Sequence, residues 1–153
     1  MVEQVRDSEE HFDENGGFRR IILLVIILLF ILVITKLSGQ SVCYQIQDDF
    51  YTDAELRGKN IVKDSTLFLL QDLTNDTLAV SYRDNYDIVI VDKSYYQTCL
   101  LGKLYTLIYH ELAHLKLRRN DKWFGSTIMN YKYLDIDLLN DPNREKYLKE
   151  LFK

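Results

Sequence analysis

Hydrophobic residues are distributed very unevenly along the chain. The first seventeen residues are rich in Asp and Glu and show no apolar period, and fourteen consecutive Leu, Ile, Val and Phe residues, Ile21–Ile34, follow them closely. Beyond this run, apolar residues recur either at alternate positions or at three- and four-residue spacing. The pattern predicts a disordered acidic tail (1–17), an apolar segment (18–39) and one small domain (40–153).

The uninterrupted apolar run predicts a transmembrane signal anchor. Fourteen helical residues span only about 21 Å, against about 30 Å for the hydrocarbon core of a bilayer. Arg19, Arg20 and Lys36 can place their charged ends at the two interfaces and extend the span to roughly nineteen residues, about 28 Å. Inserting the run into a membrane is favourable by about 4 to 8 kcal/mol. The alternatives are a buried core segment and a cleavable signal peptide, for which Gly39-Gln40-Ser41 supplies small residues.

The charges that flank the run predict its orientation. Arg6, Arg19 and Arg20 precede it, and only Lys36 follows it closely, so the N-terminus is expected on the cytoplasmic side. We therefore expect a single-pass membrane protein whose residues 40–153 lie in the periplasm or outside the cell.

Short segments of different periodicity predict an α+β domain with a small mixed sheet. Val42–Ile46 is typical of a strand, and residues 48–56 of a helix that ends at Gly58. Alternation over residues 66–71, 77–82 and 86–91 predicts three strands. A capping box at Ser94 predicts a helix over residues 95–118, and Asp141 and Pro142 predict the start of a final helix.

The long helix is expected to pack on the sheet. Its apolar residues Leu100, Leu104, Leu107 and Ile108 recur at helical spacing and form one face. Asn120 is expected to adopt the left-handed conformation that ends the helix.

Composition and charge exclude several functional classes. The 153 residues carry a net charge of −4, and no cluster of Lys and Arg offers an electrostatic site for nucleic acid. Two cysteines are too few for a disulfide scaffold or an all-thiolate zinc site, although Cys43 and Cys99 can form one bridge in an oxidising compartment. The oligomeric state cannot be inferred from these features.

The sequence His110-Glu111-Leu112-Ala113-His114 is the H-E-x-x-H pattern on the long helix. Histidines four residues apart lie on one helix face, about 5 to 6 Å apart at Cβ, so both imidazoles can reach one metal ion. Glu111 is close enough to take a proton from water activated by that ion. The alternative is a pair of surface histidines on an amphipathic helix. The apolar neighbours of the motif argue against it, because two buried imidazoles need a partner.

A catalytic zinc ion needs a third protein ligand. The remaining histidine, His11, precedes the apolar run, so we expect an oxygen ligand. Asp121, just beyond the helix, is the preferred candidate because a carboxylate binds a divalent ion better than the amide of Asn120 does. Glu145 and Glu150 on the final helix are the outside candidates.

The order of these motifs resembles that of the metzincin zinc peptidases. In that clan a third ligand follows H-E-x-x-H and a Met-containing turn comes next, here Ser126-Thr127-Ile128-Met129-Asn130-Tyr131. The chain is also similar to small bacterial zincin-like putative metallopeptidases, which share stretches like Ala54-Glu55-Leu56-Arg57-Gly58 and Tyr147-Leu148-Lys149-Glu150-Leu151-Phe152. The resemblance implies a zincin-like fold, a zinc ion, a floor below the ion made by Met129, and a catalytic role for Tyr131 near the metal or the oxyanion.

The chain departs from the metzincin pattern at two places. Asp121 stands where the third ligand is usually histidine, and Leu117 stands where glycine is common. The sequence nevertheless predicts a membrane-anchored zinc peptidase that hydrolyses a peptide or protein substrate, with His110, His114 and Asp121 as ligands and Glu111 and Tyr131 as catalytic residues. The alternative is an inactive zincin-fold protein that serves as a membrane-tethered protein-binding module.

Overall fold

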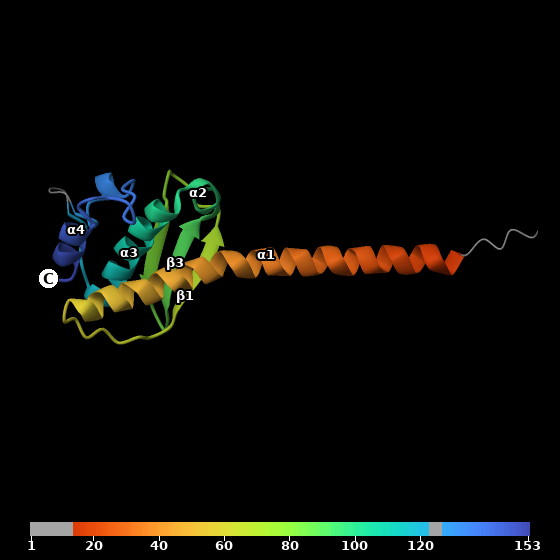
Figure 1. The fold of residues 1–153 in the computed structure, drawn as a ribbon, viewed down its shortest axis with the longest axis horizontal. Coiled ribbons are helices and arrows are strands. Elements are labelled where there is room, and N and C mark those ends of the chain that lie inside the picture. Colours follow the sequence, from red (N-terminus) through yellow and green to blue (C-terminus); the bar gives the residue numbers. More distant parts are fainter. Residues whose placement is uncertain (1–13, 123–126) are drawn as a thin grey trace, which may run out of the picture. The chain divides into compact units, whose positions relative to one another are not determined.

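The computed structural model describes residues 14–122 and 127–153, and the chain divides into two compact units, Met1–Leu37 and Ser38–Lys153. In chain order the elements are α1 (Glu14–Leu56), β1 (Thr66–Gln71), β2 (Ala79–Arg83), β3 (Asp87–Asp92), α2 (Lys93–Thr98), α3 (Leu101–Leu117), the 3₁₀ helix η1 (Tyr131–Tyr133) and α4 (Arg144–Leu151) (Figure 1). Most of the predicted acidic tail, residues 1–17, lies outside the described residues.

The first unit contributes the N-terminal part of α1. Nine consecutive apolar side chains, Ile21–Leu29, are each 43–65% exposed. Within the described residues, no helix is both long and apolar enough to cross a membrane.

The second unit begins within α1, and here the predicted strand Val42–Ile46 is wrong. The segment is helical, and its buried positions follow a helical period through to the end of the helix: Cys43, Ile46, Gln47, Phe50, Tyr51, Asp53 and Ala54. The alternation over five residues was too short to exclude a helix. The predicted end is confirmed, because α1 ends at Leu56 and Gly58 has a φ of 72°.

The three predicted strands are confirmed and form a mixed sheet in the order β1-β3-β2. β1 pairs with β3 in parallel, with Phe68 opposite Val89, and β2 pairs with β3 antiparallel, with Ser81 opposite Val89. The residues Asn75 and Asp76 that precede β2 both have positive φ values, as Asn and Asp tolerate in turns. The α+β class with a small mixed sheet is therefore confirmed.

The single long helix predicted over residues 95–118 is wrong, because the structure has two helices there. The chain is extended at Cys99 and Leu100, between α2 and α3. Asp92, rather than Ser94, caps α2: its carboxylate accepts hydrogen bonds from the Tyr95 N–H and the Ser94 hydroxyl. These bonds, the Ser94 hydroxyl first, lower the pKa of Asp92 to about 2.

Helix α3 packs against β2 and β3 (Figure 1). As predicted, Leu104, Leu107 and Ile108 are buried, whereas Leu100 precedes the helix and is 62% exposed. The core joins α1, the sheet, α3 and α4 through buried residues that include Phe50, Phe68, Tyr109, Leu112, Ile128, Leu138, Leu148 and Leu151. Cys43 and Cys99 are free thiols.

The final helix starts later than predicted. Its N-cap is Asn143 rather than Asp141, and the Asp141 carboxylate instead accepts the N–H of Asn143 at 2.7 Å, which closes a turn before the helix. Arg57 at the end of α1 binds Glu145 of α4 at 2.7 Å, and its guanidinium lies 6.0 Å from the ring centre of Phe152. The stretches Ala54–Gly58 and Tyr147–Phe152 are thus in contact through Arg57 and Phe152.

Candidate metal centre

Helix α3 is enclosed over the H-E-x-x-H segment. Residues 104–113 are all buried, and the side chains of His110 and His114 are 6% and 25% exposed. One helical turn separates the two histidines, so their rings meet: the Nε2 atoms are 3.0 Å apart, and the ring planes are inclined at 84°. The expected convergence of the two imidazoles is present in the structure.

Backbone carbonyls fix the orientation and tautomer of both rings. His110 Nδ1 lies 2.9 Å from the Ile128 carbonyl oxygen, and His114 Nδ1 lies 2.7 Å from the Arg119 carbonyl oxygen. A carbonyl oxygen only accepts, so each Nδ1 must carry the proton and donate it. In a neutral imidazole the proton on Nδ1 leaves a lone pair on Nε2, and the two lone pairs therefore face one another.

Asp121 brings a third electron-pair donor to the same point. Its Oδ1 atom lies 3.2 Å from His110 Nε2 and 3.3 Å from His114 Nε2. His110, His114 and Asp121 are a group of metal-ligating side chains that the described part of the chain gathers. Three lone-pair donors in contact repel each other unless a cation lies among them, and a metal ion satisfies all three at once.

The distances fit one small ion. Ligand atoms about 2.0–2.1 Å from a tetrahedral zinc ion are about 3.3 Å from each other. The three separations of 3.0, 3.2 and 3.3 Å are close to that value. With neutral imidazoles and an ionised carboxylate the group carries a net charge of −1, which favours a divalent cation. The donor types also fit, since imidazole suits zinc and other transition metals.

The end of α3 positions both His114 and Asp121. Arg118 adopts the left-handed conformation (φ 53°, ψ 38°), and the N–H groups of Arg118 and Arg119 both donate to the Ala113 carbonyl. The reversal carries the Arg119 carbonyl back to His114 and turns the chain towards the site. The prediction that Asn120 makes this turn is wrong by two residues, because Arg118 already satisfies the free carbonyl at the helix end.

The turn that contains Met129 supports the site from the other side. Its Ile128 carbonyl binds His110, while its Met129 carbonyl accepts the N–H of Lys122 at 2.7 Å, next to Asp121. Ile128 and Met129 are 0% and 2% exposed. One buried turn therefore orients a histidine and holds the segment that carries the carboxylate. Ser126, the first residue of the predicted turn, lies outside the described residues.

Glu111 is buried beside the first histidine. It is 6% exposed, and it makes no hydrogen bond or ion pair with any residue that the structure describes. Among the described residues, the Tyr95 hydroxyl is the fully buried side-chain polar atom that lacks a hydrogen-bond partner, and the Glu111 carboxylate is not in that position. Glu111 directly follows His110 in the sequence, and its carboxylate can accept a hydrogen bond from a bound molecule.

The other sequence candidates lie in different surroundings. Tyr131 is the first residue of η1 and is 48% exposed, with the Lys132 ammonium 5.9 Å from its ring centre, and its catalytic role remains a prediction. Glu145 binds Arg57, and Glu150 binds Lys122 at 2.7 Å, so both carboxylates have cationic partners in place of the histidines. Asn120 is exposed.

A buried lysine that sequence reasoning missed fastens the last turn of α3 to the sheet. The side chain of Lys116 is 2% exposed and binds Asp64 and, at 2.7 Å, Asp87 of β3. Arg83 binds Asp87 at 3.0 Å and also donates to the Leu115 carbonyl. Burial raises the pKa of Asp87, but the hydrogen bonds from Arg83 and Lys116 outweigh it and hold this pKa below the usual range. A Lys between apolar residues in a helix is the sequence signal for such a contact.

Comparison with known proteins identifies no family: no protein family, curated protein or solved structure matches the chain.

Proposed function

We propose that the domain is a zinc-dependent peptidase that a helix within residues 18–39 holds at a membrane. The observation that carries the proposal is the convergence of His110 Nε2, His114 Nε2 and Asp121 Oδ1 with separations of 3.0–3.3 Å. Both rings are locked by backbone carbonyls, so the donors are already oriented before any ion binds. Zinc is favoured because two imidazoles and a carboxylate, with one position left for substrate, are typical of its catalytic sites.

The neighbouring carboxylate gives the site its hydrolytic character. A bound zinc ion acts as a Lewis acid that makes water more acidic and polarises a substrate carbonyl. Glu111 is the residue that takes the proton from the attacking water and passes it to the leaving nitrogen. Its burial without a partner among the described residues supports this role, because such a carboxylate is free to bind water.

Access to the site is compatible with a peptide substrate. His110 is 6% exposed and is held by the Ile128 carbonyl, whereas the Asp121 side chain is 55% exposed and that of His114 is 25% exposed. Substrate therefore approaches from the side of Asp121. Exposure at Asp121 suits an extended chain that passes over the site.

Membrane attachment rests on the apolar run. Its residues Ile21–Leu29 have side chains that are 43–65% exposed, and fourteen apolar residues follow one another without a polar one. Replacing both Leu24 and Ile27 with arginine is expected to release the chain from the membrane fraction. The matched control replaces Leu56 and Val62, which are 77% and 78% exposed, with arginine and should leave the chain in that fraction. Membrane retention by the first variant would refute the anchor.

Glu111→Gln is the decisive substitution for the activity. It removes the base but keeps the size of the side chain and the three metal donors. We expect the full-length variant to bind as much zinc as the parent and to lose at least about a hundredfold in hydrolysis of a mixed peptide library scored by mass spectrometry. The control is Glu55→Gln, since Glu55 is exposed, faces Lys63 and lies outside the site.

The outcomes separate the peptidase from its alternative. Full hydrolysis by Glu111→Gln would contradict the mechanism. A parent chain that binds zinc and hydrolyses none of the library would favour the non-enzymatic protein-binding module. Stoichiometric iron in place of zinc would point to another use of the same two-histidine, one-carboxylate donor set.

A further inference from the structure

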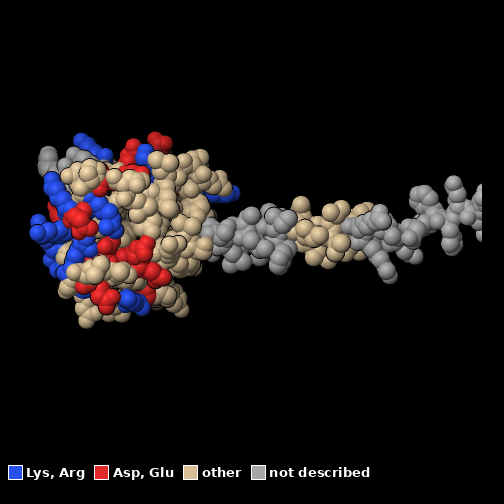
Figure 2. Space-filling view, viewed as in Figure 1, with Lys and Arg blue, Asp and Glu red and all other residues tan. Residues whose placement is uncertain are grey.

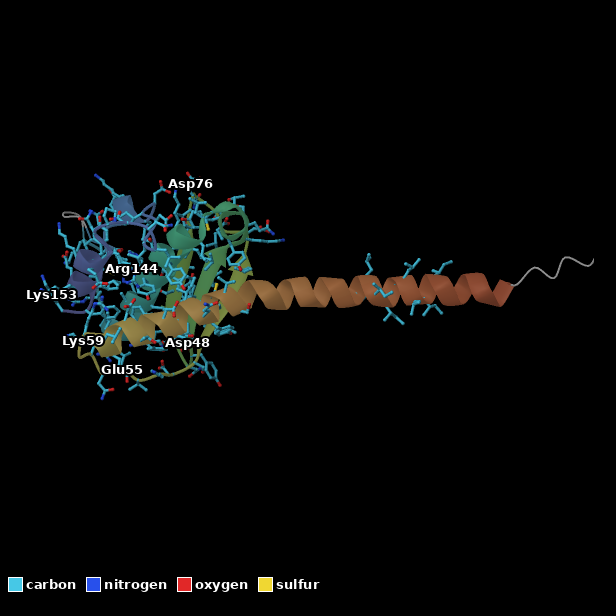
Figure 3. The ribbon with its side chains drawn as sticks, in the orientation of Figure 1. Asp48, Glu55, Lys59, Asp76, Arg144 and Lys153 are labelled. Atoms are coloured by element: carbon cyan, nitrogen blue, oxygen red, sulfur yellow. The ribbon has the colours of Figure 1, made fainter. Side chains whose placement is uncertain are left out.

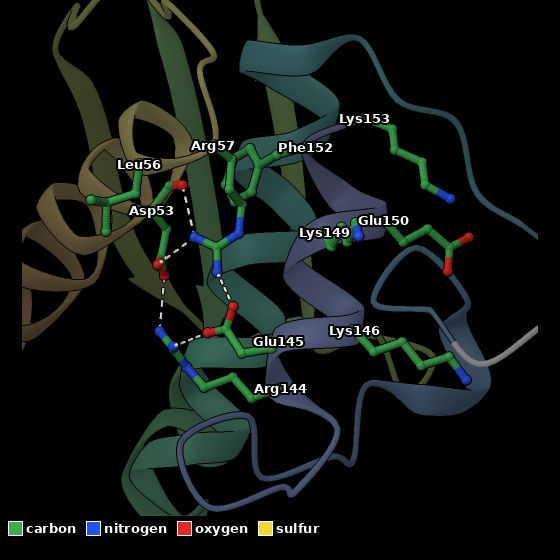
Figure 4. Close-up of a pocket in the computed structure, with 10 residues that line it drawn as sticks. All are labelled: Asp53, Leu56, Arg57, Arg144, Glu145, Lys146, Lys149, Glu150, Phe152 and Lys153. Atoms are coloured by element: carbon green, nitrogen blue, oxygen red, sulfur yellow. Dashed lines mark hydrogen bonds and ion pairs between the residues drawn. The ribbon is translucent and has the colours of Figure 1, made fainter.

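A cleft of about 990 Å³ lies between the end of α1 and α4, away from the histidine pair. Five cations line it, Arg57, Arg144, Lys146, Lys149 and Lys153, together with three carboxylates and two apolar residues (Figure 4). The excess of cations stands out because the chain as a whole carries −4. Lys and Arg are also frequent on the surface at the α4 end of the domain (Figure 2).

Ion pairs within the wall of the cleft neutralise part of this positive charge. Asp53 binds Arg57 and Arg144 at 2.9 Å each, and Glu145 binds the same two arginines at 2.7 and 3.3 Å. The Asp53 carboxylate also accepts a hydrogen bond of 2.8 Å from the Tyr109 hydroxyl, which connects this network to α3. The two arginines are therefore engaged in holding α1, α3 and α4 together.

Among the described residues, no counter-charge lies beside three lysines of the cleft. The ammonium groups of Lys146, Lys149 and Lys153 make no ion pair or hydrogen bond with any described residue, and all three residues are exposed. In Figure 4 the dashed network lies on one side of α4, and Lys146 and Lys153 extend on the other. The Lys59 ammonium donates a hydrogen bond to the main-chain oxygen of Lys153 at 2.5 Å and so holds the end of the described chain (Figure 3).

The spacing of these lysines indicates the shape of the ligand. Lys146, Lys149 and Lys153 are three and four residues apart, so they follow one face of α4 and continue past its end. Cations in a row suit an extended chain, whose alternate side chains are about 6.6–6.8 Å apart, better than a single small anion. Leu56, 77% exposed, lies on the α1 side of the cleft and leaves an apolar surface there (Figure 4).

We propose that this cleft binds an acidic peptide segment, with carboxylates of the ligand paired to Lys146, Lys149 and Lys153. The proposal does not depend on the peptidase activity. The cleft and the candidate metal centre are nevertheless linked, since Glu150 of the cleft binds Lys122, the residue after Asp121. A peptide bound in the cleft would thus lie on α4, which contacts the loop that carries Asp121.

The test measures binding of fluorescein-labelled hexaglutamate to the full-length chain by fluorescence anisotropy, with EDTA present so that no hydrolysis contributes. We expect K146Q/K149Q to weaken binding by about fivefold or more, because two ion pairs are lost. The matched control K63Q/K93Q removes two exposed lysines outside the cleft and should stay within about twofold of the parent. Binding should also weaken between about 50 mM and about 300 mM salt.

Three results would overturn the proposal. These are no binding of hexaglutamate to the parent, an equal loss in both double variants, and full displacement of the peptide by millimolar inorganic phosphate, which would indicate a small-anion site. Circular dichroism of each variant verifies that the fold is retained. Since the measurement is made without metal, its outcome is separate from the outcome for Glu111→Gln.

Discussion

The left-handed residue at the end of α3 gives a prediction that is specific to this structure. Arg118 has φ 53°, a conformation that costs a non-glycine residue about 1–2 kcal/mol. Glycine avoids this cost but loses about 0.4–1 kcal/mol through the greater freedom of the unfolded chain. The cost of the left-handed conformation exceeds the entropic cost of glycine. The variant with glycine at position 118 should therefore be more stable than the variant with alanine by about 0.5–1 kcal/mol.

The comparison of R118G with R118A isolates this effect. Both variants remove the same exposed, positively charged side chain near the helix C-terminus, so the loss of its interaction with the helix dipole is common to both. For a domain of this size the glycine variant should melt about 2–5 °C higher than the alanine variant. Thermal unfolding of the full-length chains, followed by far-UV circular dichroism, provides the measurement.

Asn120 supplies the matched control, because it is the residue that the sequence pattern favours for the turn. Its φ is not positive in the structure, so N120A should be at least as stable as N120G. Equal stability of R118G and R118A, or a glycine advantage at position 120 only, would refute the assigned turn. The position of the Arg119 carbonyl against His114 would then be wrong as well.

Further predictions concern the contacts that hold α2 and α3 in place. Lys116→Met should reduce the free energy of unfolding in urea by about 2–3 kcal/mol, since it leaves a buried aspartate short of a partner, whereas the exposed control Lys93→Met should change it by less than about 0.5 kcal/mol. The folded-state pKa of Asp92 is lowered to about 2, so its stabilisation is present above about pH 4 and is lost as the pH falls towards 2. Asp92→Asn should remove this part of the acid dependence in urea titrations across that range, and an unchanged profile would contradict the cap. Tyr109→Phe should lower the free energy of unfolding by about 1.5–3 kcal/mol through loss of its bond to the Asp53 carboxylate, and a neutral effect would contradict the buried network.

Local patterns were sufficient for the three strands and for the buried face of α3. The alternation over β1 and β3 and the apolar period of α3 reflect burial on one face, as at Phe68 and Val89, whereas β2 has no buried residue. The sequence patterns gave wrong predictions where two local signals competed. At residues 42–46 a short alternation concealed the helical period that continues to Ala54, and at Ser94 a capping box lost to the stronger, charged acceptor Asp92.

The candidate site was predictable in its side chains and unpredictable in its backbone. Histidines one turn apart must share a helix face, and a carboxylate just past the helix end can fold back to them. The carbonyls of Ile128 and Arg119, which set both tautomers, carry no sequence signal, because any residue supplies a carbonyl. Their positions depend on the left-handed turn at Arg118 and on the buried turn at Met129, which only the folded chain defines.

The proposed function depends on one divalent ion held by His110, His114 and Asp121. Its most direct test is the metal content of the full-length chain, stripped with chelator, reloaded with zinc, desalted and measured by elemental mass spectrometry. We expect one zinc per parent chain, one in the control Asp135→Asn, whose exposed carboxylate binds Lys103, and none in the double variant His110→Ala/His114→Ala. A parent chain without stoichiometric metal, or a double variant that retains it, would contradict a metal ion at this site.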